Sequence, residues 1–272
     1  MIRVCIAGAT GWAGSELARA VAKTTDLELV AAVGRRGAGG TLGDVLNDAS
    51  LKTPVYATAV EALAKPVDVL VEYTKPESAK GHILAAVRAG AHVVVGTSGL
   101  SDQDYAEIDV VAREKDRAVL ACGNFALTVV LLQRFALAAA KLIPQWEVID
   151  YASDAKRDVP SGTARELAAR LEGVRRPALT VPLDATVGPV AARGASVAGS
   201  QVHSVRLPSF AISAEVIFGM PDQRLSIRHD SGSSARPYVD GALLAIRRVS
   251  TLRGVHRGLD AVLEPPGLPE TK

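Results

Sequence analysis

The chain has few aromatic residues, few cysteines and little net charge. Aromatic residues make up 4 % of its 272 residues, and the net charge is +2. Because no basic field develops on such a chain, a nucleic-acid partner is not expected. No apolar run reaches the length that a membrane span needs, so a membrane protein is not expected either.

Only two cysteines are present, Cys5 and Cys122, and they stand far apart in the sequence. Two cysteines at this distance predict neither a disulfide framework nor a zinc site, and we expect no metal centre. They favour a reduced, cytoplasmic setting. The first residues enter a predicted strand directly, without the charged and apolar regions of a secretion signal, which agrees with that location.

Apolar residues make up 48 % of the chain, which is enough for a sizeable core. In residues 1–126, short apolar runs alternate with segments of helical periodicity. Strands are expected at 2–7, 28–33, 67–71, 92–95 and 118–121, and helices at 15–23, 78–89 and 102–115. This alternation is typical of an α/β, Rossmann-type, doubly wound parallel sheet. We therefore expect residues 1–126 to form a dinucleotide-binding domain.

The pattern changes after a predicted helix at 128–142. Strand-like segments at 147–151, 201–207, 214–218 and 224–229 are joined by longer connections, and 173–198 has the composition of a loop. We expect residues 127–237 to form an α+β substrate-binding and oligomerisation domain with a mostly antiparallel or mixed sheet. A closing helix at 238–248 is expected to pack back on the first domain. Residues 249–272 are expected to be a C-terminal segment, frayed over 264–272.

A glycine-rich turn with the spacing Gly-x-x-Gly-x-x-Gly lies between the first predicted strand and the first predicted helix. Glycines at this place let the backbone turn tightly and approach a pyrophosphate, which then sits on the helix N-terminus. The place between strand and helix makes the motif more specific than three glycines alone. The cofactor-binding residues expected in this turn are Gly8, Thr10, Gly11, Trp12, Ala13 and Gly14.

The end of the second predicted strand indicates which nucleotide binds. NAD-selective folds commonly place an acidic residue there to hold the ribose 2′-hydroxyl. This chain has Arg35 and Arg36 instead, and two guanidinium groups suit a 2′-phosphate. NADPH is therefore expected as the preferred cofactor, with NADH as the alternative.

Three further loops follow the carboxyl ends of later predicted strands, where the nicotinamide should lie. They are 73–76, 96–99 and 123–125. Their order and place together are more specific than any one of them. The residues expected to line the nicotinamide are Tyr73, Thr74, Gly96, Thr97, Ser98, Asn124 and Phe125.

The segment 147–164 contains a concentrated anion-binding loop. Pro160 opens a run of two hydroxyls and free backbone N–H groups, and Lys156 stands four residues upstream. Such a loop suits a carboxylate. The expected substrate-binding residues are Ser153, Lys156, Ser161, Gly162 and Thr163.

This loop resembles that of the dihydrodipicolinate reductase family, usually written Glu-hydrophobic-hydrophobic-Glu-x-His-His-x-x-Lys-x-Asp-Ala-Pro-Ser-Gly-Thr-Ala. The segments at 72–76, 96–99 and 123–125 resemble the family's Asp-Phe-Thr-x-Pro, Gly-Thr-Thr-Gly and Pro-Asn-Phe. Those starting at His203, Glu215 and Ser226 resemble its substrate-domain strands. The resemblance extends from residue 8 to about 247. It implies that Lys156, with residues 161–163, holds a substrate carboxylate, and that the β domain forms homotetramers.

The chain departs from the family pattern at the two histidines. Ala152 and Ser153 stand in their places, and Ala152 has no titratable group. Tyr151 and Asp154 are the nearest groups that could donate a proton. Together with Lys156 they are the catalytic candidates.

A positioned general acid contributes roughly 10²–10⁴-fold in rate, so its loss should change which substrates react well. A simple iminium already carries its proton. The first hypothesis is therefore an NADPH-dependent imine reductase or amine dehydrogenase outside lysine biosynthesis, with a carboxylate-bearing imine as substrate and a dimer or tetramer as assembly. The second is 4-hydroxy-tetrahydrodipicolinate reductase of the lysine pathway with a replacement proton donor. The third is a catalytically silent NADPH-binding regulatory protein.

Overall fold

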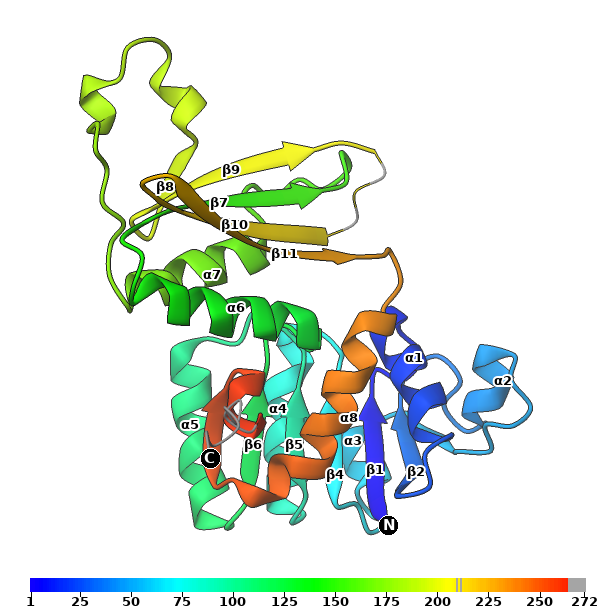
Figure 1. Ribbon diagram of the computed structural model, residues 1–272. Helices are drawn as coiled ribbons and strands as arrows, with labels where there is room; N and C mark the ends of the chain where they lie inside the picture. Colours follow the sequence, from blue (N-terminus) through cyan, green and yellow to red (C-terminus); the bar gives the residue numbers. More distant parts are fainter. Residues whose placement is uncertain (209, 211, 264–272) are drawn as a thin grey trace, which may run out of the picture. The chain divides into compact units, whose positions relative to one another are not determined.

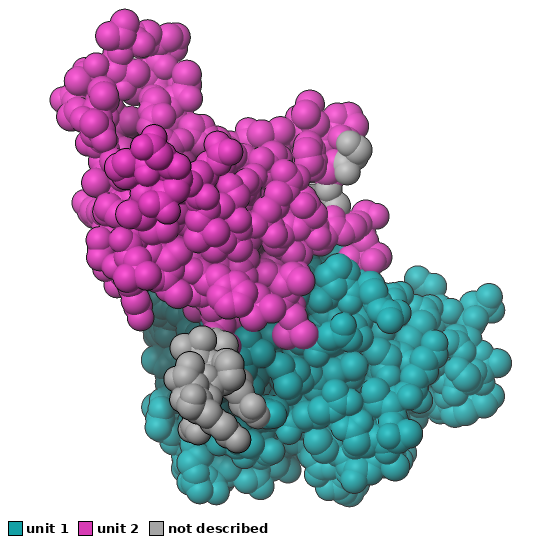
Figure 2. Space-filling view, viewed as in Figure 1, with its two compact units in different colours: residues 1–126, 235–272 teal, residues 127–234 magenta. Residues whose placement is uncertain are grey.

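The computed structural model describes residues 1–208, 210 and 212–263, and the chain divides into two compact units. Unit 1 contains residues 1–126 together with the chain from Ala235 onward. Unit 2 contains Leu127–Ser234 (Figure 2). The tail expected at 264–272 lies outside the described residues.

Unit 1 is built on a seven-stranded sheet in which every neighbouring pair is parallel (Figure 1). The strand order is β12-β6-β5-β4-β1-β2-β3. The central strands are mostly apolar and buried, as expected for a sheet that is covered on both faces. The strands are β1 (Ile2–Ala7), β2 (Leu27–Val33), β3 (Val55–Tyr56), β4 (Val69–Glu72), β5 (His92–Val95), β6 (Ala118–Ala121) and β12 (Gly254–Arg257).

Helices cover this sheet in the manner of a doubly wound fold. One face packs against α3, α4 and α5, whose buried side chains include Ile83 and Ile108. The helices α1 and α8 contact each other. The doubly wound parallel sheet expected from the sequence is confirmed. The helices of unit 1 are α1 (Trp12–Val21), α2 (Leu42–Leu46), α3 (Ala59–Ala62), α4 (Pro76–Arg88), α5 (Asp102–Glu114) and α8 (Val239–Arg248).

The C-terminal part of unit 1 differs from the expectation in two ways. Residues 249–263 were expected to be a simple segment, but Gly254–Arg257 forms β12, which pairs with β6 in parallel. The Val255 N–H donates to Asp109 in α5, which fixes this short strand. The two compact units divide before Ala235, whereas the sequence placed the boundary after residue 237.

Unit 2 holds a five-stranded mixed sheet in the order β11-β10-β7-β9-β8, in which only β7 and β9 are parallel. The expected mixed sheet is thus confirmed. The helices α6 and α7 cover one of its faces, and Trp146 and Phe218 lie in the core between sheet and helices. The elements are α6 (Leu127–Ala140), β7 (Gln145–Ala152), α7 (Gly162–Glu172), β8 (Ala195–Val197), β9 (Ser200–Arg206), β10 (Ile212–Met220) and β11 (Gln223–Ser231).

Helix α7 was not among the expected helices, although its pattern is present in the sequence. Ala164, Leu167, Ala168 and Leu171 are buried at helical spacing. Ser161 is its N-cap and accepts a hydrogen bond from the Ala164 N–H. The expected loop at 173–198 also contains β8 and two short 3₁₀ helices. The loop expected to bind an anion therefore leads into the first turn of a helix.

Candidate cofactor and substrate sites

The glycine-rich turn of unit 1 joins β1 to α1. Gly8 has a φ of +84°, and a Cβ at this residue would lie 2.3 Å from the Tyr73 carbonyl oxygen. A Cβ at Gly14 would lie 2.1 Å from the Gly8 carbonyl oxygen. Both positions therefore require glycine. Gly11 caps α1 without a side chain, so the first N–H groups of the helix are left for an anion.

The second expected contact with the nucleotide lies just beyond β2. Arg35 and Arg36 are both exposed, and the Arg36 guanidinium donates a long hydrogen bond, 3.5 Å, to the Val45 carbonyl. Thr10 lies beside this segment, since a Cβ at Gly34 would be 3.3 Å from its hydroxyl. The absence of an acidic residue at the end of β2 holds in the structure as in the sequence.

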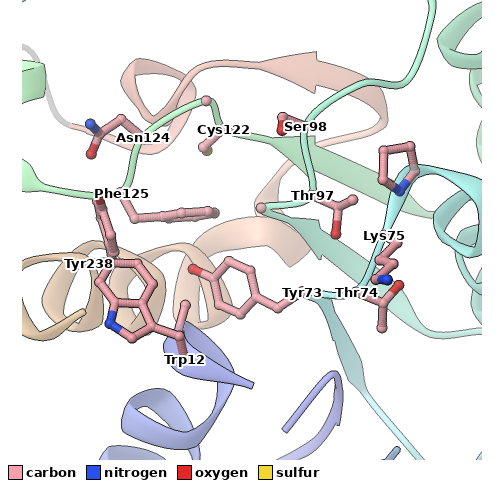
Figure 3. A pocket seen from close by; sticks show the side chains of 14 residues that line it. Trp12, Tyr73, Thr74, Lys75, Thr97, Ser98, Cys122, Asn124, Phe125 and Tyr238 are labelled. Carbon is pink, nitrogen blue, oxygen red and sulfur yellow. The ribbon is translucent and has the colours of Figure 1, made fainter. Parts of the chain in front are cut away.

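A cavity of about 420 Å³ opens where β4, β5 and β6 end (Figure 3). Its lining includes every residue that the sequence predicted for the nicotinamide side, as well as Trp12 and Ala13 of the glycine turn. The carboxyl ends of parallel strands meet at one edge of a sheet, which is why loops so distant in sequence converge here. Two lining residues, Cys122 and Tyr238, were not predicted. Tyr238, directly before α8, lines the cavity although it is more than a hundred residues away in sequence from the three loops.

A buried carboxylate ties two of these loops together. Glu72, the last residue of β4, is completely buried. Its carboxylate accepts hydrogen bonds from the Thr74 N–H at 2.8 Å and the Thr97 hydroxyl at 3.3 Å, and it also binds the Thr74 hydroxyl. His82 Nδ1 on α4 lies 2.8 Å from its other oxygen. Glu72 and His82 thus hold the loops of β4 and β5 in one arrangement. The sequence analysis did not identify this pair.

Aromatic side chains from four segments surround the cavity (Figure 3). Trp12 and Tyr238 are in edge contact with ring centroids 5.8 Å apart, and Tyr73 and Phe125 make the same kind of contact. Such a concentration stands out in a chain with only 4 % aromatic residues. Flat aromatic walls suit a planar ring such as nicotinamide.

In unit 2, the expected substrate loop is held by a buried carboxylate on β7. Asp150 is completely buried and accepts hydrogen bonds from the Ser161 N–H at 2.9 Å and from Arg206 at 2.7 Å. Burial alone would raise the pKa of Asp150, but the bonds from Ser161 and Arg206 outweigh it, and the pKa lies below its usual range. Arg206 also donates to the Asp158 carbonyl. Asp150 and Arg206, both absent from the predicted site, fix the start of α7.

The expected anion-binding groups gather around this helix start. Gly162 and Thr163 form the first turn of α7, where backbone N–H groups favour negative charge. Lys156 is partly exposed and lies 2.8 Å from Asp158. That contact holds the pKa of Asp158 below its usual range. The arrangement can hold a carboxylate, with Lys156 exchanging its surface partner for the ligand.

Tyr151 and Asp154, the two candidates next to the replaced histidines, lie in different surroundings. Along β7 buried and half-buried residues alternate, so Ala152 lies on the helix-covered face, completely buried, and Tyr151 on the other. Tyr151 donates to Glu215, and its pKa is raised by burial and by that carboxylate. Asp154 is exposed and accepts from the Ser153 hydroxyl.

The described residues offer neither a metal site nor a membrane-spanning helix. No group of three His, Cys, Asp or Glu side chains in this part of the chain could hold a metal ion. None of the helices within 1–208 and 212–263 is long and apolar enough to cross a membrane.

Comparison with known proteins agrees with the geometry of both units. The family model for the N-terminus of dihydrodipicolinate reductase matches residues 2–125, and the model for its C-terminus matches 128–263. A Geobacillus kaustophilus protein named 4-hydroxy-tetrahydrodipicolinate reductase is 38 % identical over 265 residues, covering 97 % of this chain and 99 % of that protein. One of the same name from Moorella thermoacetica is 37 % identical, with 97 % and 98 % covered.

Solved structures show the same relationship. A dipicolinate-bound dihydrodipicolinate reductase from Paenisporosarcina sp. TG-14 matches with a TM-score of 0.84 and 29 % identity, covering 97 % of this chain and all of that one. An amine dehydrogenase from Mycobacterium smegmatis shares the fold, with a TM-score of 0.69, 14 % identity, and 97 % and 96 % covered. Since both family models and these near-full-length relatives agree, this chain belongs to the dihydrodipicolinate reductase family.

Proposed function

We propose that this protein is an NAD(P)H-dependent 4-hydroxy-tetrahydrodipicolinate reductase of the lysine and diaminopimelate pathway. The observation that carries the proposal is the 38 % identity, over 97 % of the chain, to a protein of that name. The sequence alone favoured an imine reductase outside lysine biosynthesis. The names of the relatives favour the lysine-pathway substrate, so we place it first.

Members of this family use a nicotinamide cofactor, which when bound supplies the hydride. The glycine turn would bind its pyrophosphate, and the loops around Thr74, Thr97 and Asn124 would orient the nicotinamide in the cavity. The cradle at Gly8 and Gly14, which a Cβ would fill, fits this role. We propose NADPH as the preferred form, because Arg35 and Arg36 stand where a 2′-phosphate would be held.

The first turn of α7 would hold a substrate carboxylate. Backbone N–H groups at Gly162 and Thr163 attract the anion, and Lys156 supplies a full positive charge. Asp150 keeps this turn in place through Ser161 and takes no part in binding itself. Dipicolinate, the ligand named for the Paenisporosarcina structure, carries such carboxylates and is the natural probe.

A second candidate function is the reduction of another carboxylate-bearing imine, outside lysine biosynthesis. The favouring observation is the pair Ala152 and Ser153, which supplies no imidazole beside an intact carboxylate loop. An iminium substrate needs no acid, because it already carries its proton. For the lysine-pathway substrate, Asp154 or Tyr151 would have to replace the donor, and the Tyr151 hydroxyl is already engaged with Glu215.

Steady-state kinetics separates these functions. Purified protein with NADPH is given freshly generated 4-hydroxy-tetrahydrodipicolinate or, separately, a panel of cyclic imines with one carboxylate. Faster cofactor oxidation with 4-hydroxy-tetrahydrodipicolinate supports the first function, and faster oxidation with another imine supports the second. Binding of NADPH without its oxidation in the presence of any of these substrates would overturn both and favour the regulatory protein.

The carboxylate loop is tested in the same assay. Lys156→Ala should raise KM about 10- to 100-fold, as expected for a lost hydrogen bond to a charged group. Lys141→Ala, which removes an exposed lysine at the end of α6, is the matched control and should leave KM unchanged.

We also propose that the protein forms a homo-oligomer, a dimer or a tetramer. The face of the unit 2 sheet that α6 and α7 leave uncovered carries the half-buried side chains of Ile149, Tyr151 and Ile217. Light scattering at micromolar concentration should give a mass of two or four chains, and a single-chain mass would contradict this proposal.

A further inference from the structure

The cavity of unit 1 contains a hydroxyl group that has no role in holding the fold. The Tyr73 hydroxyl oxygen is buried, and no hydrogen-bond partner is present for it among the described residues. Buried hydroxyls are almost always hydrogen-bonded, because the unmade bond is costly. Figure 3 shows the Tyr73 ring reaching into the cavity, with its hydroxyl directed toward the side where Phe125, Trp12 and Tyr238 lie.

Three other side chains of the cavity already make hydrogen bonds within the protein. The hydroxyls of Thr74 and Thr97 both bind the Glu72 carboxylate. The side-chain oxygen of Asn124 accepts a hydrogen bond from the Ala126 N–H. Tyr73 therefore brings to this cavity a buried hydroxyl that is not committed to another protein group.

The Tyr73 ring is also fixed in place. Its backbone packs against Gly8, and a Cβ at Gly96 would lie 1.8 Å from a ring carbon, so the ring is packed closely against Gly96. The edge contact with Phe125 closes another side. A ring held in this way cannot turn its hydroxyl out to solvent. The hydroxyl stays where the nicotinamide end of the cofactor is proposed to bind.

We propose that the Tyr73 hydroxyl binds the carboxamide of the cofactor's nicotinamide ring and thereby orients the ring for hydride transfer. This inference rests on the proposed function of unit 1 as the nicotinamide site. A phenol can both donate and accept, and a primary amide offers both a carbonyl oxygen and N–H groups. The family pattern places Phe at this position, so the hydroxyl belongs to this chain rather than to the motif.

An alternative role for Tyr73, as the acid that replaces the lost histidines, is less consistent with its surroundings. Burial, with smaller contributions from Cys122 and Tyr238, raises its pKa well above the usual value of 10.0. A phenol in this state keeps its proton at neutral pH and gives it up reluctantly. It suits a permanent hydrogen bond rather than proton transfer.

The carboxamide reaches the covered hydroxyl when a lining side chain moves. Trp12 is the lining aromatic residue with the most freedom, because it is 58 % exposed and its ring makes an edge contact with Tyr238. Phe125, by contrast, is 3 % exposed. Cofactor binding should therefore change the fluorescence of Trp12.

Calorimetric titration of Tyr73→Phe tests the proposal without any substrate. The variant keeps the ring and removes only the hydroxyl. It should weaken NADPH binding about 3- to 10-fold, the effect of one neutral hydrogen bond. Binding of 2′-phospho-ADP-ribose, which lacks the nicotinamide, should be unchanged. Tyr105→Phe is the matched control. It removes the hydroxyl of a tyrosine outside the cavity, whose ring stacks on Arg257, and it should change neither affinity.

Each outcome of these titrations supports or overturns the hydrogen bond between Tyr73 and the carboxamide. Weaker binding of NADPH alone supports the hydrogen bond to the carboxamide. An unchanged NADPH affinity, or equal weakening of both ligands, would overturn it. If the wild-type protein binds 2′-phospho-ADP-ribose but Tyr73→Phe shows normal NADPH affinity, only this inference fails. If the wild-type protein binds no nicotinamide nucleotide, the proposed function fails with it.

Discussion

His82 Nδ1 on helix α4 lies 2.8 Å from Glu72 Oε2 at the end of β4, and that carboxylate is completely buried. A carboxylate removed from water is stable only when its oxygens are hydrogen-bonded. His82 takes one oxygen, and the loops of β4 and β5 take the other through Thr74 and Thr97. The pair therefore joins a helix and two cofactor loops at a single point.

We expect Glu72→Gln to lower both stability and cofactor affinity. The amide keeps the shape of the side chain but turns a donor toward groups that also donate. The free energy of unfolding in urea should fall by about 1–3 kcal/mol. The Kd for NADPH should rise in the same variant. Glu77→Gln, an exposed glutamate in the first turn of α4, should stay within about 0.5 kcal/mol of wild type, and equal losses in the two variants would contradict this account.

Replacing Arg35 and Arg36 together by alanine should reduce the preference for NADPH. Each guanidinium can make charged hydrogen bonds to the 2′-phosphate, so NADPH affinity should fall about 10- to 100-fold. NADH lacks this phosphate and should be affected less than about 3-fold. Fluorescence titration with both nucleotides measures this. Arg88→Ala, an exposed arginine at the end of α4, removes the same charge elsewhere, and a similar loss there would argue against a specific phosphate site.

The two positions of the replaced histidines should respond differently to restoration. Ala152 is completely buried on the helix-covered face of β7, so Ala152→His must displace its neighbours and should cost about 1–3 kcal/mol of stability. Ser153 is half-buried beyond the strand, and Ser153→His should cost less than about 1 kcal/mol. Thermal unfolding of the two single variants, side by side, tests this order. Ser153→His is then the better variant for testing whether a restored imidazole can act as the proton donor.

His229 should make stability depend on pH. It is 5 % exposed, the Thr128 hydroxyl lies 2.9 Å from its Nδ1, and burial lowers its pKa below 6.5. Below pH 6.5 the unfolded chain takes up a proton that the folded protein does not. The free energy of unfolding should therefore fall as the pH decreases from 6.5, by at most about 1.4 kcal/mol per pH unit, and this contribution should be constant above 6.5.

Urea unfolding between pH 5.5 and 8.5, chosen about the ordinary histidine pKa, measures this slope. The variant His229→Gln should lose part of it, while His92, whose pKa is also lowered by burial, keeps the rest. An identical slope in the wild type and the variant would show that His229 is not the group responsible.

Much of the fold could be predicted because its signals are local. The strands β1, β4, β5 and β6 are mostly apolar, as expected for strands covered on both faces. The strands β3 and β12 have two and four residues, too few for a pattern, and their pairing depends on distant partners. Helix α7 has a clear pattern, but Ser161 and Gly162 also have the composition of a turn, so its start was taken for a loop.

The candidate site divides in the same way. Its loops were predicted because the ends of parallel strands are a known place for ligands. The supporting contacts were not, because they join residues that are remote in sequence. Tyr238 meets Trp12 from the other end of unit 1, and Arg206 reaches Asp150 from another strand. No motif spacing in the sequence predicts contacts between residues so far apart along the chain.

The pairing of β12 with β6 has a consequence for synthesis on the ribosome. Unit 2 is complete once residue 234 has emerged, but unit 1 still lacks α8 and its edge strand at Gly254–Arg257. Domains commonly fold in the order in which they are translated. Here the unit that is begun first is completed after the other, and a nascent chain exposes the open edge of β6 until Gly254–Arg257 has emerged.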